Sequence, residues 1–300
     1  MEPTGEQAEL RHGGQRVVVV EAGGGIRAYH ADGRAVLAGY DAGQVAPAAR
    51  GQLLIPWPNR LHRGRYSWDG TDHELPITEP AQNTAIHGLT RWLRWTAGER
   101  SESAVTMRLL LLPQPGYPFA LDLAAAYALA DDGLTVTVTA TNVGDVAAPY
   151  AAGAHPYLAV AGDRIDEATL RIPAGTWLPT GPAQIPIGRE PVAGTPYDFR
   201  EPRPIGPVHL DHAFTDLHRD GRGRAVVSLT SAGLTTLLWV DESHPYLEIF
   251  TADALPGPAR RGSLGVEPMT CPPNGLQTGE DVIRIEPGAT VSSSWGVVPG

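Results

Sequence analysis

The 300-residue chain contains no lysine, and all 23 of its basic residues are arginines. Arginine does not lose its proton near neutral pH, so it cannot serve as an amine nucleophile. Schiff-base aldolases, pyridoxal-phosphate enzymes and Walker-type phosphate loops each require a lysine. The sequence therefore excludes these three classes.

Cysteine and long apolar runs are also scarce. Cys271 is the single cysteine, so the chain forms neither an intrachain disulfide nor a multi-thiolate zinc site. No stretch reaches 18 uninterrupted apolar residues, and the N-terminal MEPTGEQAEL lacks a basic region followed by an apolar run. We expect a soluble, cytoplasmic protein with no membrane partner.

Positive charge is in deficit, since 33 acidic residues outnumber 23 basic ones and give a net charge of −10. The arginines form no stripe that would follow a phosphate backbone. We therefore expect no nucleic-acid partner.

Turn-forming residues are abundant: 35 glycines and 28 prolines interrupt the chain often enough to leave little room for helices. Residues 134–142 alternate apolar side chains with threonine, which predicts a half-buried strand, and the preceding 131–133 (DDG) predicts a hairpin turn. Residues 121–130 are ambiguous because their alanines favour a helix while their large side chains keep a strand's period. The hairpin context favours a strand.

Further short segments have the composition and period of strands. They are 16–20, 26–30, 104–112, 224–230, 234–240, 246–252, 281–287 and 289–298, with a hairpin over 65–75 that turns at Asp69-Gly70. Many short strands without β–α alternation predict one all-β domain over residues 1–300, a large antiparallel sandwich or barrel. The proline-rich segment 173–207 is the least regular, and we expect a long excursion over one end of the sandwich or over a binding cleft.

In the segments 153–158 and 265–275 a histidine or a glutamate directly precedes a proline, namely His155 and Glu267. Proline favours extended backbone at the preceding residue and removes a hydrogen-bond donor from a strand ladder. We therefore expect both residues where a strand ends or bulges, with side chains directed by a stiff backbone.

Five short motifs follow one another along the chain: Asn59-Arg60, His87-Gly88, Gly153-x-His155-Pro156-Tyr157, Asp211 in LDHAF, and Glu267-Pro268 followed by Asn274. Their order resembles the aldose 1-epimerase (galactose mutarotase) family, and within it the bacterial branch of epimerase-like proteins. The resemblance implies a large antiparallel β-sandwich, the galactose mutarotase-like supersandwich, with its site in an open cleft on one sheet.

The same resemblance implies the roles of the site residues. Glu267 would be the general base that removes a proton from the anomeric hydroxyl, and His155 the general acid that protonates the ring oxygen. Arg60, His87, Asp211 and Asn59 would hold the sugar. The implied partner is a monosaccharide, bound by a monomer or a homodimer.

This chemistry is consistent with the residue types. One acid and one base on opposite sides of a pyranose suffice, without a metal or cofactor. Glutamate has an ordinary pKa of about 4.3 and histidine of about 6.5. His155 must therefore be held protonated by a neighbouring charge, such as that of Asp211 or Glu267.

Three other hypotheses for the function remain open. The same chemistry on a phosphorylated or sulfonated hexose would use additional arginines, such as Arg63, Arg91 or Arg94, to grip the anion. A non-catalytic carbohydrate-binding protein would keep the fold without the reaction. His87, His155 and Glu267 would also suit a two-histidine, one-carboxylate metal site.

The tetrapeptide HPYL occurs twice, at 155–158 and at 244–247. We interpret His244 as structural, because Pro245 begins a strand-like segment. Candidates for a sugar-stacking wall are Trp57, Trp92 and Trp95. Gly275 departs from the family pattern, which has alanine after the asparagine.

Overall fold

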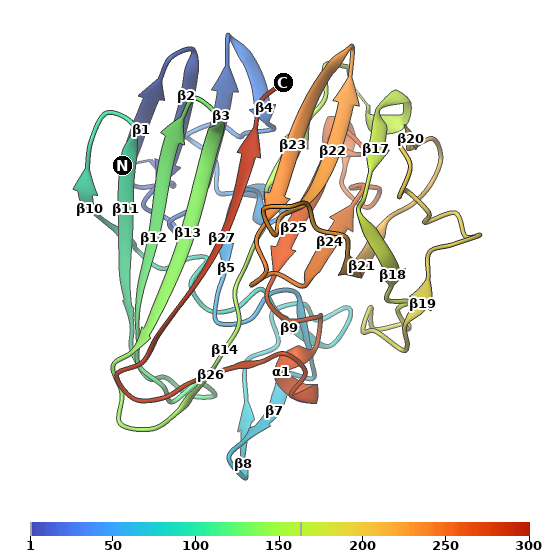
Figure 1. Ribbon diagram of the computed structural model, residues 1–300. Helices are drawn as coiled ribbons and strands as arrows, with labels where there is room; N and C mark the ends of the chain where they lie inside the picture. Colours follow the sequence, from blue (N-terminus) through green and yellow to red (C-terminus); the bar gives the residue numbers. More distant parts are fainter. Residues whose placement is uncertain (1, 163) are drawn as a thin grey trace.

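The computed structural model describes residues 2–162 and 164–300 and consists almost entirely of antiparallel β-strands (Figure 1). Two large sheets, of 12 and 9 strands, are accompanied by three two-stranded sheets. Within the described residues the one α-helix is the short α1 (Gly275–Thr278). No described helix is long and apolar enough to cross a bilayer.

The 12-stranded sheet carries the residues of the later argument. Its main order is β1 (Gln7–His12), β2 (Gln15–Val20), β3 (Ile26–Ala31), β4 (Arg34–Leu37), β16 (Tyr157–Ala159), β25 (Ser263–Met269), β24 (Tyr246–Phe250), β21 (Asp211–Leu217), β18 (Ala174–Trp177) and β19 (Glu190–Pro191). The two remaining strands branch from this path, since β15 (Gly153–Ala154) pairs with both β25 and β5 (Leu53–Leu54).

The nine-stranded sheet has the order β10 (Thr96–Arg100), β11 (Ala104–Leu111), β12 (Leu121–Ala130), β13 (Gly133–Asn142), β27 (Thr290–Val298), β23 (Leu234–Val240), β22 (Ala225–Ser231), β17 (Thr169–Arg171) and β20 (Arg203–Pro204). The small sheets pair β14 (Ala148–Tyr150) with β26 (Ile283–Ile285), β6 (Arg60–His62) with β9 (Thr84–Ile86), and β7 (Arg65–Trp68) with β8 (Thr71–Glu74). Three 3-10 turns complete the described elements: η1 (Pro47–Ala49), η2 (Ile165–Glu167) and η3 (Gly257–Ala259).

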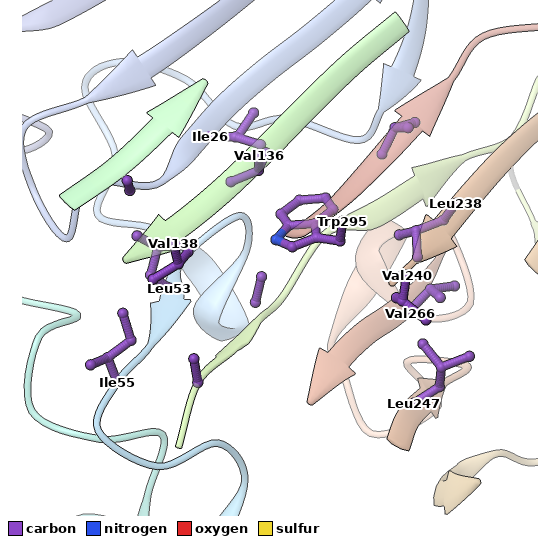
Figure 2. Packing of buried hydrophobic residues seen from close by; sticks show 14 of the residues in the cluster. Ile26, Leu53, Ile55, Val136, Val138, Leu238, Val240, Leu247, Val266 and Trp295 are labelled. Atoms are coloured by element: carbon purple, nitrogen blue, oxygen red, sulfur yellow. The ribbon is translucent and has the colours of Figure 1, made fainter. Parts of the chain in front are cut away.

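The core lies between the two large sheets. Figure 2 shows Val136 and Trp295 of the nine-stranded sheet in one cluster with Ile26, Leu247 and Val266 of the 12-stranded sheet. Successive side chains of a strand point to opposite faces, so an alternating segment buries one set and exposes the other. Each fully buried large aliphatic side chain contributes about 1.5–3 kcal/mol, and the cluster draws on most strands of both sheets.

The predicted all-β fold is confirmed. The ambiguous segment 121–130 is strand β12, which forms the predicted hairpin with β13, and the predicted 65–75 hairpin is β7–β8. The expected strand over 281–287 is shorter, reduced to β26. Asp281 has a left-handed φ of 52° and Pro287 supplies no hydrogen-bond donor.

The proline-rich segment 173–207 is irregular, as predicted, but it also extends both large sheets. It supplies β18 and β19 at the edge of the 12-stranded sheet and β20 at the edge of the nine-stranded sheet. Between β18 and β19 it forms a turn closed by a bridge between Thr180 and Pro186. This turn places residues 180–186, which are distant in sequence from β24 and β25, beside the cleft.

Candidate active site

Strand register builds the floor of a cleft on the 12-stranded sheet. β21, β24 and β25 lie side by side, with Phe250 opposite Asp211 and Glu248 opposite Glu267. Residues opposite each other in antiparallel strands project to the same face, and residues two apart on one strand do so as well. The four side chains therefore share one face of the sheet, while Ile249, between Glu248 and Phe250, points into the core.

His155 lies in a break between two strands. β15 ends at Ala154 and β16 begins at Tyr157, so His155 and Pro156 occupy the gap between them. The backbone N–H of His155 donates to the carbonyl of Gln52 at 3.0 Å, and its carbonyl accepts from the N–H of Gly51 at 2.9 Å. The predicted position at a strand end is confirmed for His155, and its backbone is fixed on both sides.

The same prediction is wrong for Glu267, which lies inside β25, a strand paired on both edges. Pro268 is tolerated there because of the break at His155. The N–H groups of Val266 and Thr270 donate to carbonyls of Pro156 and Ala152, and the nitrogen of Pro268 faces the same side between them. A missing donor at this gap leaves the ladder intact.

The two predicted proton-transfer groups are in contact. Nε2 of His155 lies 3.2 Å from Oε1 of Glu267, and the two residues are 5% and 2% exposed. The imidazole stacks on the ring of Tyr157 at a centroid distance of 4.9 Å and an interplanar angle of 9°. The guanidinium of Arg50 covers the ring of Tyr157 at 4.1 Å, so the imidazole has little freedom to rotate.

The expectation that a neighbouring charge keeps His155 protonated is wrong. Burial, followed by the positive charges of Arg91 and Arg50, lowers the pKa of His155 to about 3. Burial, with the charge of Asp211, raises the pKa of Glu267 well above its ordinary value. Although the 3.2 Å contact has the geometry of an ion pair, burial of both groups favours a neutral pair with one proton on Glu267.

His87 is held in one tautomer by the backbone. The N–H of Asn59 donates to Nδ1 of His87 at 3.2 Å, so the neutral ring carries its hydrogen on Nε2. The ring meets that of His155 edge-on at 5.3 Å, and burial lowers the pKa of His87 well below its ordinary value. Gly88 is required beside it, since a β-carbon there would lie 2.1 Å from the carbonyl oxygen of Ile55.

Arg60 is fixed by a carboxylate and by a neighbouring turn. Its Nε and Nη2 donate to the two carboxylate oxygens of Glu79 at 2.8 and 3.0 Å. The N–H of Asn274 donates to the carbonyl of Arg60 at 2.7 Å, and Oδ1 of Asn274 accepts from the N–H of His62 at 2.9 Å. Asn274 thus orders strand β6 and does not line the cleft itself.

The structure brings the six predicted residues to one cleft of about 350 Å³, within the range of about 300–1,000 Å³ usual for small-molecule sites. It is lined by Asn59, Arg60, His87, His155, Asp211 and Glu267, together with Ala48, Ala49, Glu79, Gln82, Ile86, Arg91, Tyr157, Gln184, Phe250, Ala254 and Leu255.

The aromatic wall of the cleft differs from the expected one. Tyr157 and Phe250 line it, whereas Trp57 and Trp95 are buried and Trp92 is 56% exposed outside it. Tyr157 belongs to the same sequence motif as His155, and this proximity could have indicated that Tyr157 lines the cleft. Phe250 carried no local signal, because only strand register places it opposite Asp211.

Gln184 is a further lining residue without a sequence signal. Its Nε2 donates to Oδ2 of Asp211 at 3.2 Å, and it stands in the turn closed by Thr180 and Pro186 with a left-handed φ of 53°. The predicted excursion therefore does reach the cleft. Of the three arginines considered for an anion, Arg91 alone lines the cleft; Arg63 is exposed and Arg94 pairs with Glu21.

The potential metal ligands are also near one another. His87, His155 and Glu267 each offer one ligand atom, all within 4.8 Å of one another. The positive charges of Arg91 and Arg60 contribute, after burial, to the lowered pKa of both histidines. This positive potential opposes a divalent cation as it opposes a proton.

Gly275, where the family pattern has alanine, has a physical explanation. A β-carbon there would lie 2.8 Å from Sγ of Cys271 and 3.0 Å from the carbonyl oxygen of Glu280. We expect Gly275→Ala to lower the free energy of unfolding by about 1–3 kcal/mol through overpacking. Denaturant unfolding of both single variants and of the double variant with Cys271→Ala checks this. If Gly275→Ala lowers the free energy of unfolding equally with and without Cys271→Ala, the overpacking does not involve the thiol of Cys271.

His244 lies at a turn away from the cleft. Its Nδ1 is 3.1 Å from Oδ1 of Asp241, and its backbone carbonyl accepts from Arg219 at 2.9 Å. It is buried and is absent from the cleft lining. The two HPYL tetrapeptides therefore differ in surroundings, and His244 provides a control for substitution of His155.

Comparisons with known proteins show which family the chain is similar to. The family model described as aldose 1-epimerase matches residues 6–296. An uncharacterised Escherichia coli K12 protein, YihR, is 31% identical over 292 residues, which is 96% of this chain and 91% of that one. Galactose mutarotase of Rattus norvegicus is 27% identical over 224 residues, covering 70% and 64% of the two chains. The crystal structure of galactose 1-epimerase from Lactobacillus acidophilus has a TM-score of 0.82 at 22% identity, covering 98% of this chain and 94% of that one.

Proposed function

The chain belongs to the aldose 1-epimerase family, and from this premise we propose that it is an isomerase that interconverts the α and β anomers of an aldose. The observation that carries the proposal is the contact of His155 with Glu267 in the floor of a sugar-sized cleft. Ring opening requires one proton to leave the anomeric hydroxyl and one to reach the ring oxygen. A pair that shares a single proton is sufficient for both transfers.

The adjacency of the pair suits the substrate better than the expected placement on opposite sides of a pyranose. The anomeric hydroxyl oxygen and the ring oxygen are both bonded to the same carbon. Two groups that serve these oxygens can therefore be neighbours, as His155 and Glu267 are at 3.2 Å. The gap of a pyranose width between acid and base is absent.

The reaction begins with a proton transfer inside the pair. Without a sugar the proton rests on Glu267, and hydrogen bonds from sugar hydroxyls to the carboxylate favour its charged form, which moves the proton to His155. Glu267 then takes the proton of the anomeric hydroxyl, and His155 protonates the ring oxygen as its bond to the anomeric carbon breaks. The open-chain aldehyde rotates about the adjacent carbon–carbon bond. Closure on the other face reverses both transfers and restores the pair.

The remaining polar groups hold the ring. Nε2–H of His87, the guanidinium of Arg60 and the carboxyl of Asp211 line the cleft at fixed positions. Asn59 acts through its backbone, since its N–H sets the tautomer of His87. Phe250 offers an apolar surface to the carbon–hydrogen face of a sugar.

Exchange between anomers tests the proposal, followed by polarimetry or by nuclear magnetic resonance for a panel of free aldoses. We expect acceleration in proportion to protein concentration and unchanged rates with a chelator. Binding of a sugar without acceleration would contradict catalysis and support a carbohydrate-binding protein. Loss of activity in chelator, restored by a metal, would contradict the metal-free mechanism.

A second candidate is the same reaction on a phosphorylated or sulfonated sugar, and Arg91 favours it. The guanidinium of Arg91 lines the cleft. Its Nε is buried without a hydrogen-bond partner, and its Nη2 donates a hydrogen bond to the carbonyl of Ile86 at 3.3 Å. Arg60 beside it is already paired with Glu79. The guanidinium of Arg91, which pairs with no described carboxylate, can therefore bind an anionic group in the cleft.

We expect Arg91→Gln to raise KM for an anionic hexose about 10- to 100-fold, and to raise it far less for the uncharged sugar, because hydrogen bonds between charged groups are lost only with the anion. Steady-state rates on a hexose, its 6-phosphate and its sulfonated analogue measure this. Arg94→Gln, at an exposed arginine outside the cleft, is the matched control. Equal effects of Arg91→Gln on charged and uncharged sugars would contradict an anion site.

A further inference from the structure

Glu248 lies beside Glu267 on the same face of the 12-stranded sheet, and the proton transfers proposed above give it no part. The register of β24 and β25 places the two glutamates directly opposite each other. The β-carbons of opposite residues in antiparallel strands are about 4.5–5.5 Å apart. Two side chains of this length on one face can bring their carboxyl groups into contact.

Both glutamates have an oxygen in need of a partner. Glu248 is 3% exposed, and its Oε2 is buried without a hydrogen bond. Oε1 of Glu267 lies 3.2 Å from Nε2 of His155, and its Oε2 is likewise buried without a hydrogen bond. Two ionised carboxylates only accept hydrogen bonds, but a protonated carboxyl also donates one. A proton on one glutamate would therefore satisfy both orphaned oxygens.

The charges around Glu248 decide whether it carries a proton in addition to the one that Glu267 shares with His155. Asp211 on β21 and Glu267 on β25 are acidic, His155 behind Glu267 is neutral, and the cation Arg60 on β6 is already bonded to a carboxylate. Burial, then Asp211 and Glu267, raises the pKa of Glu248 well above its ordinary value. When Glu267 is ionised, its charge raises the pKa of Glu248 and so favours a proton on Glu248.

We propose that Glu248 stays protonated and donates its carboxyl hydrogen to Oε2 of Glu267, which makes it a positioning residue for the carboxylate that removes the anomeric proton. The inference rests on the proposed function, since it gives Glu248 a part in that reaction. A donor to the charged form makes Glu267 easier to ionise and so opposes the effect of burial. It also fixes the carboxylate with Oε1 toward His155.

Two substitutions separate this role from simple packing. Glu248→Leu removes the donor at similar size, and we expect it to lower kcat about 10- to 100-fold with a smaller change in KM. The acid side of the kcat–pH profile should move to higher pH, because Glu267 has lost a donor to its charged form. Glu248→Gln keeps a neutral N–H donor. Unlike Glu248→Leu, it should therefore retain most of the kcat of the natural protein and the position of the acid side of its kcat–pH profile.

Three outcomes would overturn the proposal. Profiles and kcat values of both variants that match the natural protein would show that Glu248 does not act on Glu267. A shift of the acid limb to lower pH in both variants would show that Glu248 is ionised and repels Glu267. A rise confined to KM would show that Glu248 contacts the sugar instead.

A stability measurement keeps the test independent of catalysis. A carboxyl whose folded pKa is raised contributes stability that is present below its unfolded pKa and is lost as pH rises through the folded pKa. The free energy of unfolding of Glu248→Gln, relative to the natural protein, should therefore increase from about pH 5 to about pH 9. A growing difference without any isomerase activity would refute the proposed function alone. A constant difference would refute the protonated Glu248, whether or not Glu248→Leu folds.

Discussion

Glu267→Gln is expected to lose nearly all acceleration of anomer exchange, by about 10²–10⁴-fold in kcat, because an amide cannot take a proton. The neighbouring Oε1 position at 3.2 Å from Nε2 of His155 would still be filled by a side chain of the same size. The fold should be retained, since Glu267 is buried and neutral in the ligand-free protein. Anomer exchange, with circular dichroism as a check of folding, measures the loss.

The pH dependence of stability provides a second readout for the same variant. The pKa of Glu267 is raised in the folded protein, so its contribution to stability is present at acidic pH and is lost as pH rises through that pKa. Glu267→Gln should therefore unfold at a similar or higher denaturant concentration than the natural protein above neutral pH. A folded Glu267→Gln protein with ordinary rates would refute the assignment of the base.

His155→Asn is expected to lower kcat by a similar factor of about 10²–10⁴, because the amide neither accepts nor releases the proton that passes to the ring oxygen. The imidazole is also the partner of Glu267, so its removal leaves the buried carboxyl without that contact. The double variant should be little worse than either single one, since the two groups act as a unit. Anomer exchange by the three variants under one set of conditions tests this.

The chain contains a matched control for that substitution. His244→Asn makes the same change in the second HPYL tetrapeptide, where the side chain contacts Asp241 and is outside the cleft. We expect unchanged kcat in His244→Asn and a reduced free energy of unfolding. Equal losses of activity at positions 155 and 244 would show that the effect arises from the fold and not from proton transfer.

The sequence supports the fold prediction well because its signal is local. Alternation of apolar residues and threonine over 134–142, followed through a tight turn from 121–130, is a property of neighbouring residues, and it reappears as the β12–β13 hairpin. The two-residue turn at Asp69-Gly70 is equally local. The shortened strand at 283–285 shows the limit of such signals, because one left-handed residue ends what composition would extend.

The site residues likewise fall into two groups, those that the sequence predicted and those that it did not. The motif order predicted Asn59, Arg60, His87, His155, Asp211 and Glu267, and the structure brings them to one cleft. Gln184 and Phe250, which line the cleft, and Glu248, which lies beside Glu267, were missed, since strand register or a distant turn places each of them there. Whether their side chains face the site depends on which residue lies opposite on another strand, and a single segment does not contain that information.

The order of residues along the chain by itself determined the strand pattern, the absence of lysine chemistry, and the identity of the acid and base to be tested. The tertiary structure alone decided that His155 and Glu267 touch, and that the proton between them rests on the carboxyl. The physical reason is that proton affinity follows burial and nearby charge. Those depend on Arg50, Arg91 and Asp211, which lie far from both residues in the sequence and come near them only in the folded protein.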